Sequence, residues 1–337
     1  MPFLPTAAYS IHLEVALDNI PNTLGRLATA IGGAGANIMS MGGFDVRGDL
    51  LINDVVVNCR DEDHAAAVVA AVEGLSGVQL LDWYDRTFNM HEGGKIGVVS
   101  LAEVNDRHDL SMAYTPGVAR VCMAIHEDPA RSHDLTIRKN TVAVVTDGTA
   151  VLGLGDIGPA AAMPVMEGKA LLFKEFAGVD AFPICLDVND PQEIIDTVIR
   201  IAPTFGGINL EDIAAPAAFE VEEALREALD IPVFHDDQHG TAVVVLAALW
   251  NSCRLTGRQI GDLSVVIAGM GAAGVAVGRI LLGAGVGSIV GVDRSGAVYS
   301  GRDNLNSAKV WIAEHTNPER KMGTLAEVLV GTDVFIG

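Results

Sequence analysis

Two hydrophobic periods alternate along the first 90 residues of the chain. Apolar residues at every second position predict strands, and apolar residues three and four positions apart predict helices. Strands are predicted at 8–20, 37–46, 50–58 and in VQLLDWYDRTF. Helices are predicted within IPNTLGRLATAIGGAGANI, where Gly-Ala-Asn is a stop signal, and in DEDHAAAVVAAVEGL. The resulting β-α-β-β-α-β order predicts a ferredoxin-like unit over residues 1–90.

A different pattern follows the glycine-rich segment HEGGKIGVV (91–99), which we interpret as a linker. From about 95 to 250, short apolar runs alternate with amphipathic helical segments, as in parallel sheets with crossover helices. From 254 onward the chain is predicted to form a strand, a glycine turn, a helix and a second strand. We therefore expect an α/β fold with three domains, at 1–90, 91–253 and 254–337.

Composition and charge narrow the class of protein. The chain has 337 residues, of which 50% are hydrophobic and 19% charged, and its formal net charge is −21. Such a chain can bury a core, and its negative field disfavours nucleic acids and anionic membranes as partners. The four cysteines are widely spaced, which fits neither a disulfide framework nor a zinc knuckle. With no signal peptide and no apolar run of about 20 residues, we expect a cytoplasmic protein.

The GxGxxG pattern occurs twice, and the second copy carries the full signature of a dinucleotide site. Gly269, Gly271 and Gly274 follow the predicted strand LSVVIA, and a helix opens at Ala272-Ala273. Asp293 ends the next strand, where an acid receives the ribose hydroxyls. Because its charge would repel a 2′-phosphate, we expect NAD, with NADP as the alternative.

The first copy, at 153–158, is interpreted as a tight structural turn near the active site. Asp156 lies inside this loop, where its charge would oppose a phosphate. Pro159 and Pro164 are also expected to disturb the helix that a dinucleotide site requires.

Two pairs of adjacent carboxylates indicate a cation site. Glu211-Asp212 and Asp236-Asp237 each follow a predicted strand, and oxygen ligands without cysteine favour Mg²⁺ or Mn²⁺. Solvated acids or helix caps are the alternative interpretation. His235 and His239 have the spacing of a zinc pair, but a turn expected at Gly240 argues against a shared helical face.

Lys169, Lys174 and Tyr114 are candidates for proton transfer. Lys169 is expected at the start of a largely apolar helix, where burial or a nearby cation lowers a lysine pKa towards that of a general base. A surface lysine is the alternative for it and for Lys174. Tyr114 precedes Thr-Pro-Gly, and a phenol held by a rigid turn can serve as a general acid, although structural tyrosines are common.

Taken together, four motifs resemble a malic enzyme of the smaller bacterial type. They are DLSMAYTPGVA, VTDGTAVLGLGDIGPAAAMPVMEGKALLFKEFAGVDAFPICLD, FGGINLEDIAAP and VFHDDQHGTA, in this order before a dinucleotide loop. The resemblance implies oxidative decarboxylation of L-malate to pyruvate and CO₂ with NAD(P)⁺ and Mn²⁺ or Mg²⁺. It implies Tyr114 as general acid and Lys169 as general base.

The same resemblance implies the ligands of the metal and of the cofactor. Glu211, Asp212 and Asp237 match the metal ligands of the family. The cofactor loop is matched by Gly269, Gly271, Ala272, Ala273 and Gly274, with Asp293 after it.

The first unit resembles an ACT domain, on its topology and its strand–DNIPNTLGRL–helix–GANI pattern. This resemblance implies a small-molecule effector near Asp18 to Gly25, and pairing of the units into a homodimer or higher homo-oligomer. A unit that only dimerises is the alternative.

Two departures from the malic enzyme pattern bear on activity. Ala150 stands near the position of an arginine in larger members, so the substrate carboxylate needs another partner, such as Lys174 or an arginine elsewhere. The chain also ends at GTDVFIG, so part of the NAD domain is expected to be missing. A non-decarboxylating NAD dehydrogenase of a hydroxy or amino acid, or an inactive effector-binding fragment, therefore stay open as alternatives.

Overall fold

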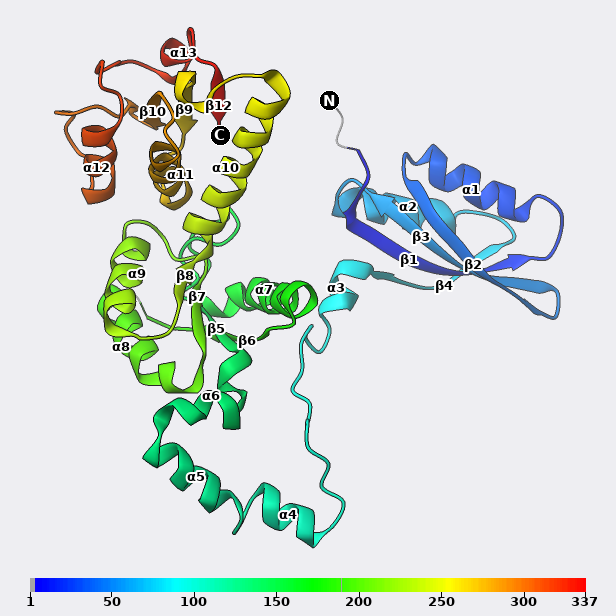
Figure 1. Ribbon diagram of the computed structural model, residues 1–337. Coiled ribbons are helices and arrows are strands. Elements are labelled where there is room, and N and C mark those ends of the chain that lie inside the picture. The colour runs from blue at the N-terminus through cyan, green and yellow to red at the C-terminus, as the bar shows by residue number, and fades with distance from the viewer. Residues whose placement is uncertain (1–3, 189) are drawn as a thin grey trace. The chain divides into compact units, whose positions relative to one another are not determined.

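The computed structural model describes residues 4–188 and 190–337. The chain divides between Gly97 and Val98 into two compact units (Figure 1). In the first unit the elements are β1 (Thr6–Asp18), α1 (Thr23–Gly33), β2 (Asn37–Arg47), β3 (Leu50–Cys59), α2 (Glu62–Glu73), β4 (Val78–Asp85) and α3 (Arg86–His91). The sheet order is β2-β3-β1-β4, and every neighbouring pair is antiparallel. The β-α-β-β-α-β order predicted from the sequence is therefore confirmed.

The core of this unit lies between the sheet and the helices α1 and α2. Alternate residues of β1, Ile11, Leu13 and Val15, are fully buried against Leu27 of α1 and Val68 of α2. The prediction of a strand through Phe88 is wrong at its end. Asp85 accepts hydrogen bonds from the backbone N–H groups of Thr87 and Phe88, and this cap begins α3.

The second unit begins with helices and continues into a parallel sheet. Its first part contains α4 (Arg107–Ala113), α5 (Val118–Glu127), α6 (Ser132–Leu135), β5 (Thr141–Thr146), α7 (Pro159–Ala177), β6 (Asp180–Cys185), α8 (Pro191–Ile201), β7 (Gly207–Leu210), α9 (Ala217–Ala228), β8 (Val233–His235) and α10 (Asp236–Thr256). The four strands are parallel in the order β6-β5-β7-β8. Their carboxyl ends therefore meet at one edge, where polar side chains after β5, β7 and β8 are brought together.

The remainder of this unit is a second sheet with its own helices. It contains β9 (Ser264–Ala268), α11 (Ala272–Gly283), β10 (Ser288–Asp293), β11 (Gly296–Ala297), α12 (Ser307–His315), α13 (Leu325–Val328) and β12 (Val334–Ile336). The order is β11-β10-β9-β12, with β10 and β12 parallel to β9. Short 3-10 turns occupy Pro129–Arg131, Ile137–Asn140, Ala202–Thr204 and Ile260–Asp262. The strand, glycine turn, helix and strand expected from 254 onward are observed.

The helix α10 connects the two sheets of the second unit. Ala242, Leu249 and Cys253 of this helix are buried in one core with Leu263 and Val275. The domain boundary that we expect at 253 thus falls inside a continuous helix whose second half packs with the β9–β12 sheet.

Two expectations about helix breakers are wrong. Pro159 occupies the first position of α7, where a missing N–H costs no hydrogen bond, and the helix continues through Pro164 to Ala177. Gly240 does not form a turn either, because α10 begins at Asp236 and includes it. Among the described residues, no helix is long and apolar enough to cross a membrane.

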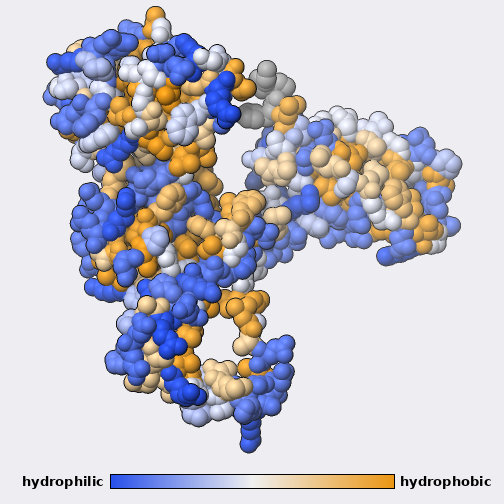
Figure 2. All heavy atoms as spheres, in the orientation of Figure 1, coloured by the Kyte–Doolittle hydropathy of each residue, from blue (hydrophilic) through white to orange (hydrophobic). Residues whose placement is uncertain are grey.

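Helices α4 and α5 bury no residue. Leu110, Met112, Val121 and Met123 are between 36% and 59% exposed. Apolar residues also come to the surface at the bottom of Figure 2, over this part of the chain.

Candidate active site

Lys169 lies between two carboxylates from different strands. It is near the middle of α7, not at the start of a helix as the sequence suggested. Its ammonium group is 3.0 Å from Oε1 of Glu211 and 2.5 Å from Oδ2 of Asp236. Burial lowers the pKa of Lys169, but the hydrogen bonds and charges of Asp236 and Glu211 outweigh it and hold this pKa above its ordinary value. The expected depression of this pKa is therefore not observed.

The three carboxylates that the sequence singles out as metal ligands lie together. One oxygen each of Glu211, Asp212 and Asp237 is within 4.8 Å of the others, and Glu211 and Asp212 are buried. Burial, with repulsion by Asp237, raises the pKa of Glu211 to about 7 and that of Asp212 to about 6, against the lowering effect of Lys169. A divalent cation would remove this repulsion.

The backbone around Asp212 is also organised for this cluster. Asp212 adopts a left-handed conformation with φ 52°, and its N–H donates to Oδ2 of Asp237 over 2.9 Å. Its own Oδ2 is buried with no hydrogen-bond partner among the described residues. An orphaned carboxylate oxygen beside two other carboxylates fits an Mg²⁺ or Mn²⁺ ligand set.

Two further side chains, the buried Asn209 and the partly buried Thr149, support the cluster and were missed in the sequence. Asn209 donates to Oε2 of Glu211 over 2.9 Å and leaves Oε1 facing Lys169. Thr149 donates to Asp147 and accepts from the N–H of Ala214, just after the metal ligands. The β5 and β7 loops are thereby joined, a long-range contact with no local sequence signal beyond a polar residue at a strand end.

Other candidate residues do not join this cluster. Tyr114 ends α4, is 69% exposed, and its phenol makes no hydrogen bond to another described residue. Lys174 pairs with Asp180 over 2.7 Å at the amino end of β6, away from the carboxyl edge, so it is no partner for a substrate there.

The zinc alternative is not supported. His239 contacts Glu222 at 2.6 Å. His235 is fully buried, and neither ring nitrogen makes a hydrogen bond among the described residues, although Nε2 lies 3.9 Å from Oδ2 of Asp237. Within the described ranges, the group of side chains with metal-binding geometry consists of carboxylates and includes neither histidine.

The second glycine loop borders a cavity of about 1410 Å³ at the ends of β9 and β10. Gly269, Gly271 and Asp293 line it, and Ala272 and Ala273 open α11 beside it. Gly274 is buried there, and an added Cβ would collide with the carbonyl of Gly269. These glycines allow the close packing that a dinucleotide loop needs.

Asp293 has two cationic partners that its sequence position did not reveal. Oδ2 accepts hydrogen bonds from Arg302 over 2.6 Å and from Lys309 over 2.8 Å, and Oδ1 accepts one from the N–H of Ser295. Burial opposes the charge of Asp293, but these donors hold its pKa far below the ordinary value. The carboxylate is therefore ionised and fixed at the edge of the cavity.

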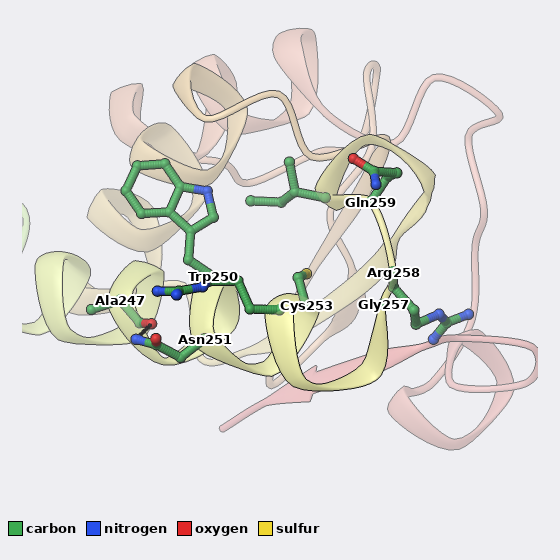
Figure 3. A pocket seen from close by; sticks show the side chains of 9 residues that line it. Ala247, Trp250, Asn251, Cys253, Gly257, Arg258 and Gln259 are labelled. Atoms are coloured by element: carbon green, nitrogen blue, oxygen red, sulfur yellow. Dashed lines mark hydrogen bonds between the residues drawn. The ribbon is translucent and has the colours of Figure 1, made fainter.

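A smaller cavity of about 540 Å³ lies along the second half of α10 (Figure 3). Its lining includes Trp250, Asn251 and Arg254, whereas the predicted catalytic, metal and cofactor residues lie elsewhere. The chemistry is therefore concentrated at the two strand-end regions.

Comparison with known proteins agrees with this geometry. Residues 93–226 match the malic enzyme N-terminal domain, and residues 238–337 match the malic enzyme NAD binding domain. The chain belongs to the malic enzyme family. The first match contains Lys169, Glu211 and Asp212, the second contains the glycine loop, and Asp236 and Asp237 lie between the two.

Relatives and solved structures extend the likeness along the chain. An NAD-dependent malic enzyme of Geobacillus stearothermophilus is 53% identical over 333 residues, which are 98% of this chain and 69% of that enzyme. An NADP-dependent malic enzyme of Escherichia coli is 47% identical over 247 residues, 72% of this chain and 32% of the relative. The crystal structure of an NAD-dependent malic enzyme from Thermotoga maritima superposes with a TM-score of 0.73 at 50% identity, covering 75% of this chain and 68% of that one.

Proposed function

We propose that this chain catalyses the oxidative decarboxylation of L-malate to pyruvate and CO₂, with reduction of NAD⁺ or NADP⁺. The observation that carries the proposal is Lys169 held at 3.0 Å from Glu211, within a cluster of metal-ligand carboxylates at the strand ends. Membership of the malic enzyme family indicates L-malate as the substrate. A non-decarboxylating dehydrogenase, the alternative, would have no use for this carboxylate cluster.

Each residue has a separate task in this reaction. Lys169, as the neutral amine, removes the proton of the C2 hydroxyl while hydride leaves C2 for the nicotinamide. Glu211, Asp212 and Asp237 hold the cation. When bound, Mn²⁺ or Mg²⁺ supplies a Lewis acid for the oxygen at C2, which favours loss of CO₂ from the neighbouring β-carboxylate. Tyr114 donates a proton to C3 of the resulting enolate.

We also propose that the chain works as a homodimer or higher homo-oligomer. The phenol of Tyr114 is too exposed in a single chain to deliver a proton in a closed site. Its flanking helices α4 and α5 leave apolar side chains uncovered, including Leu110 and Met123. An exposed apolar face of this kind marks a surface for protein association.

We propose that the first unit is an ACT-like regulatory domain. Its β-α-β-β-α-β order and antiparallel sheet support this assignment. The end of β1 and the start of α1 pack against the turn before β4, because a Cβ on Gly77 would meet the Asp18 carboxylate at 2.8 Å and Arg26 at 3.3 Å. An effector would bind near Asp18 to Gly25, and pairing without an effector is the alternative.

The test of the catalytic proposal is NADH formation with L-malate, NAD⁺ and Mn²⁺. The substitution Lys169→Ala should lower kcat by at least about a hundredfold, the scale of general base catalysis. Lys174→Ala on the same helix is the matched control and should keep at least half of the activity. Equal effects of the two substitutions would contradict the role given to Lys169.

A further inference from the structure

The first turn of α10 carries two essential carboxylates but lacks a side-chain cap. Asp236 contacts Lys169, and Asp237 belongs to the carboxylate cluster. The N-cap residue His235 makes no side-chain capping bond. A helix start without a cap is less stable than a capped one, so contacts with neighbouring elements gain importance for fixing this turn.

Glu222 of α9 provides such an interaction. Its Oε1 contacts Nε2 of His239 at 2.6 Å, and its Oε2 accepts a hydrogen bond from Nε2 of Gln238 over 3.2 Å. The Glu222 side chain is only 8% exposed, so both oxygens need partners. One buried carboxylate thus holds two consecutive residues of α10, directly after Asp237.

The cluster itself creates the need for this contact. Glu211, Asp212 and Asp237 lie within 4.8 Å of one another, and like charges at this distance repel. Asp237 is the member that belongs to α10, so repulsion pushes the first turn of this helix away from β7. The bonds from Glu222 of α9 tie Gln238 and His239, the two residues after Asp237, to a second element and so restrict movement of this turn.

We propose that Glu222 is a positioning residue that sets the place of Asp237, and with it the affinity of the metal site. It touches neither substrate nor cofactor, and it acts through Gln238 and His239. The inference rests on the proposed metal site and adds to it a residue outside the ligand set.

The test measures Mn²⁺ binding by calorimetry, together with the melting temperature and KM for Mn²⁺. Loss of partners behind metal ligands typically weakens metal affinity by about 10- to 100-fold. Glu222→Ala should raise the Kd of Mn²⁺ at least tenfold, and Glu222→Gln, which keeps the volume and one acceptor, about threefold or more. His239→Ala should weaken binding as well, and adding it to Glu222→Ala should cause little further loss.

The neighbouring Glu223 provides the matched control, because it is exposed on the same helix and its substitution by Gln removes the same charge. Glu223→Gln should leave the Kd within twofold of the original. A Glu222→Gln protein with a lower melting temperature but an unchanged Kd would reduce Glu222 to a structural role and overturn the proposal. If the unaltered chain bound no Mn²⁺, the proposed metal site would fail together with this inference.

Discussion

Lys169, the proposed general base, is held in place by the same carboxylates that favour its protonated form. Asp236 and Glu211 orient its ammonium group, and both raise its pKa. A cation that draws the negative charge of Glu211 would weaken this effect and favour the neutral amine. The metal site and the base are therefore linked through one shared carboxylate.

The first prediction concerns the pH dependence of kcat. Asp236→Asn removes one charge that raises the pKa of Lys169, so the base loses its proton at lower pH. The acidic limb of the profile should move down by about one pH unit, even if maximal kcat falls. Steady-state rates between pH 5 and 9 measure this shift, and movement to higher pH would contradict it.

The second prediction concerns metal affinity. With pKa values of about 7 for Glu211 and about 6 for Asp212, both groups carry protons at low pH that a cation must displace. The Kd of Mn²⁺ should fall at least about tenfold between pH 5.5 and pH 7.5. Calorimetry at both values tests this, and a Kd independent of pH would contradict the raised pKa values.

The residues that carry chemistry differ in how far the sequence reveals them. That Glu211, Asp212 and Asp237 lie together could be expected because parallel strands bring their ends to one edge, and the resemblance to malic enzymes pointed to these three as ligands. The sequence did not reveal that Arg302 and Lys309 pair with Asp293. An ion pair between residues 9 or 16 positions apart leaves no periodic signal in the sequence. The raised pKa of Lys169 likewise depends on contacts made only in the fold.

At the scale of elements, the glycine loop before α11 shows how backbone packing sets cofactor binding. Gly274 lies against the carbonyl of Gly269 with no room for a side chain. The helix start can therefore approach the strand closely beside the cavity, and helix N-termini of this kind commonly bind a pyrophosphate.

The third prediction uses two glycines of this one helix. Gly274→Ala should weaken NAD⁺ binding at least tenfold, because the added methyl forces the loop away from the helix. Gly283→Ala, where nothing lies within 4 Å, should leave binding unchanged and favour the helix by up to about 1 kcal/mol. Calorimetry with NAD⁺ and thermal melts distinguish the two, and equal NAD⁺ affinities would contradict the account.

Elements were predicted well where periodicity is strong and less well at their ends. The parallel strands and their crossover helices were expected from alternating apolar runs. Pro159 was misjudged because its effect depends on its place in the helix, which is the first position. The start of α10 was missed because Asp236 and Asp237 precede the apolar part of the helix.

At the scale of the whole molecule, the exposed surface of α4 and α5 determines the expected assembly. The fourth prediction is a sedimenting mass of at least twice the 35.3 kDa of one chain. Met123→Glu, at a side chain that is 54% exposed, should shift the protein towards monomers and lower activity. Ile199→Glu on α8, 37% exposed, is the control and should leave the mass unchanged. A monomeric unaltered chain would contradict the proposed oligomer.

In the proposed reaction, oxidation at C2 is followed by loss of the C4 carboxylate, which is β to the new ketone. The most direct measurement supplies L-malate labelled with ¹³C at C4, with NAD⁺ and Mn²⁺, and follows labelled CO₂, pyruvate and NADH together. We expect one labelled CO₂ and one pyruvate for each NADH formed. None of these three products should form with the Lys169→Ala variant. NADH formed with oxaloacetate, and with the label retained in it, would contradict the account.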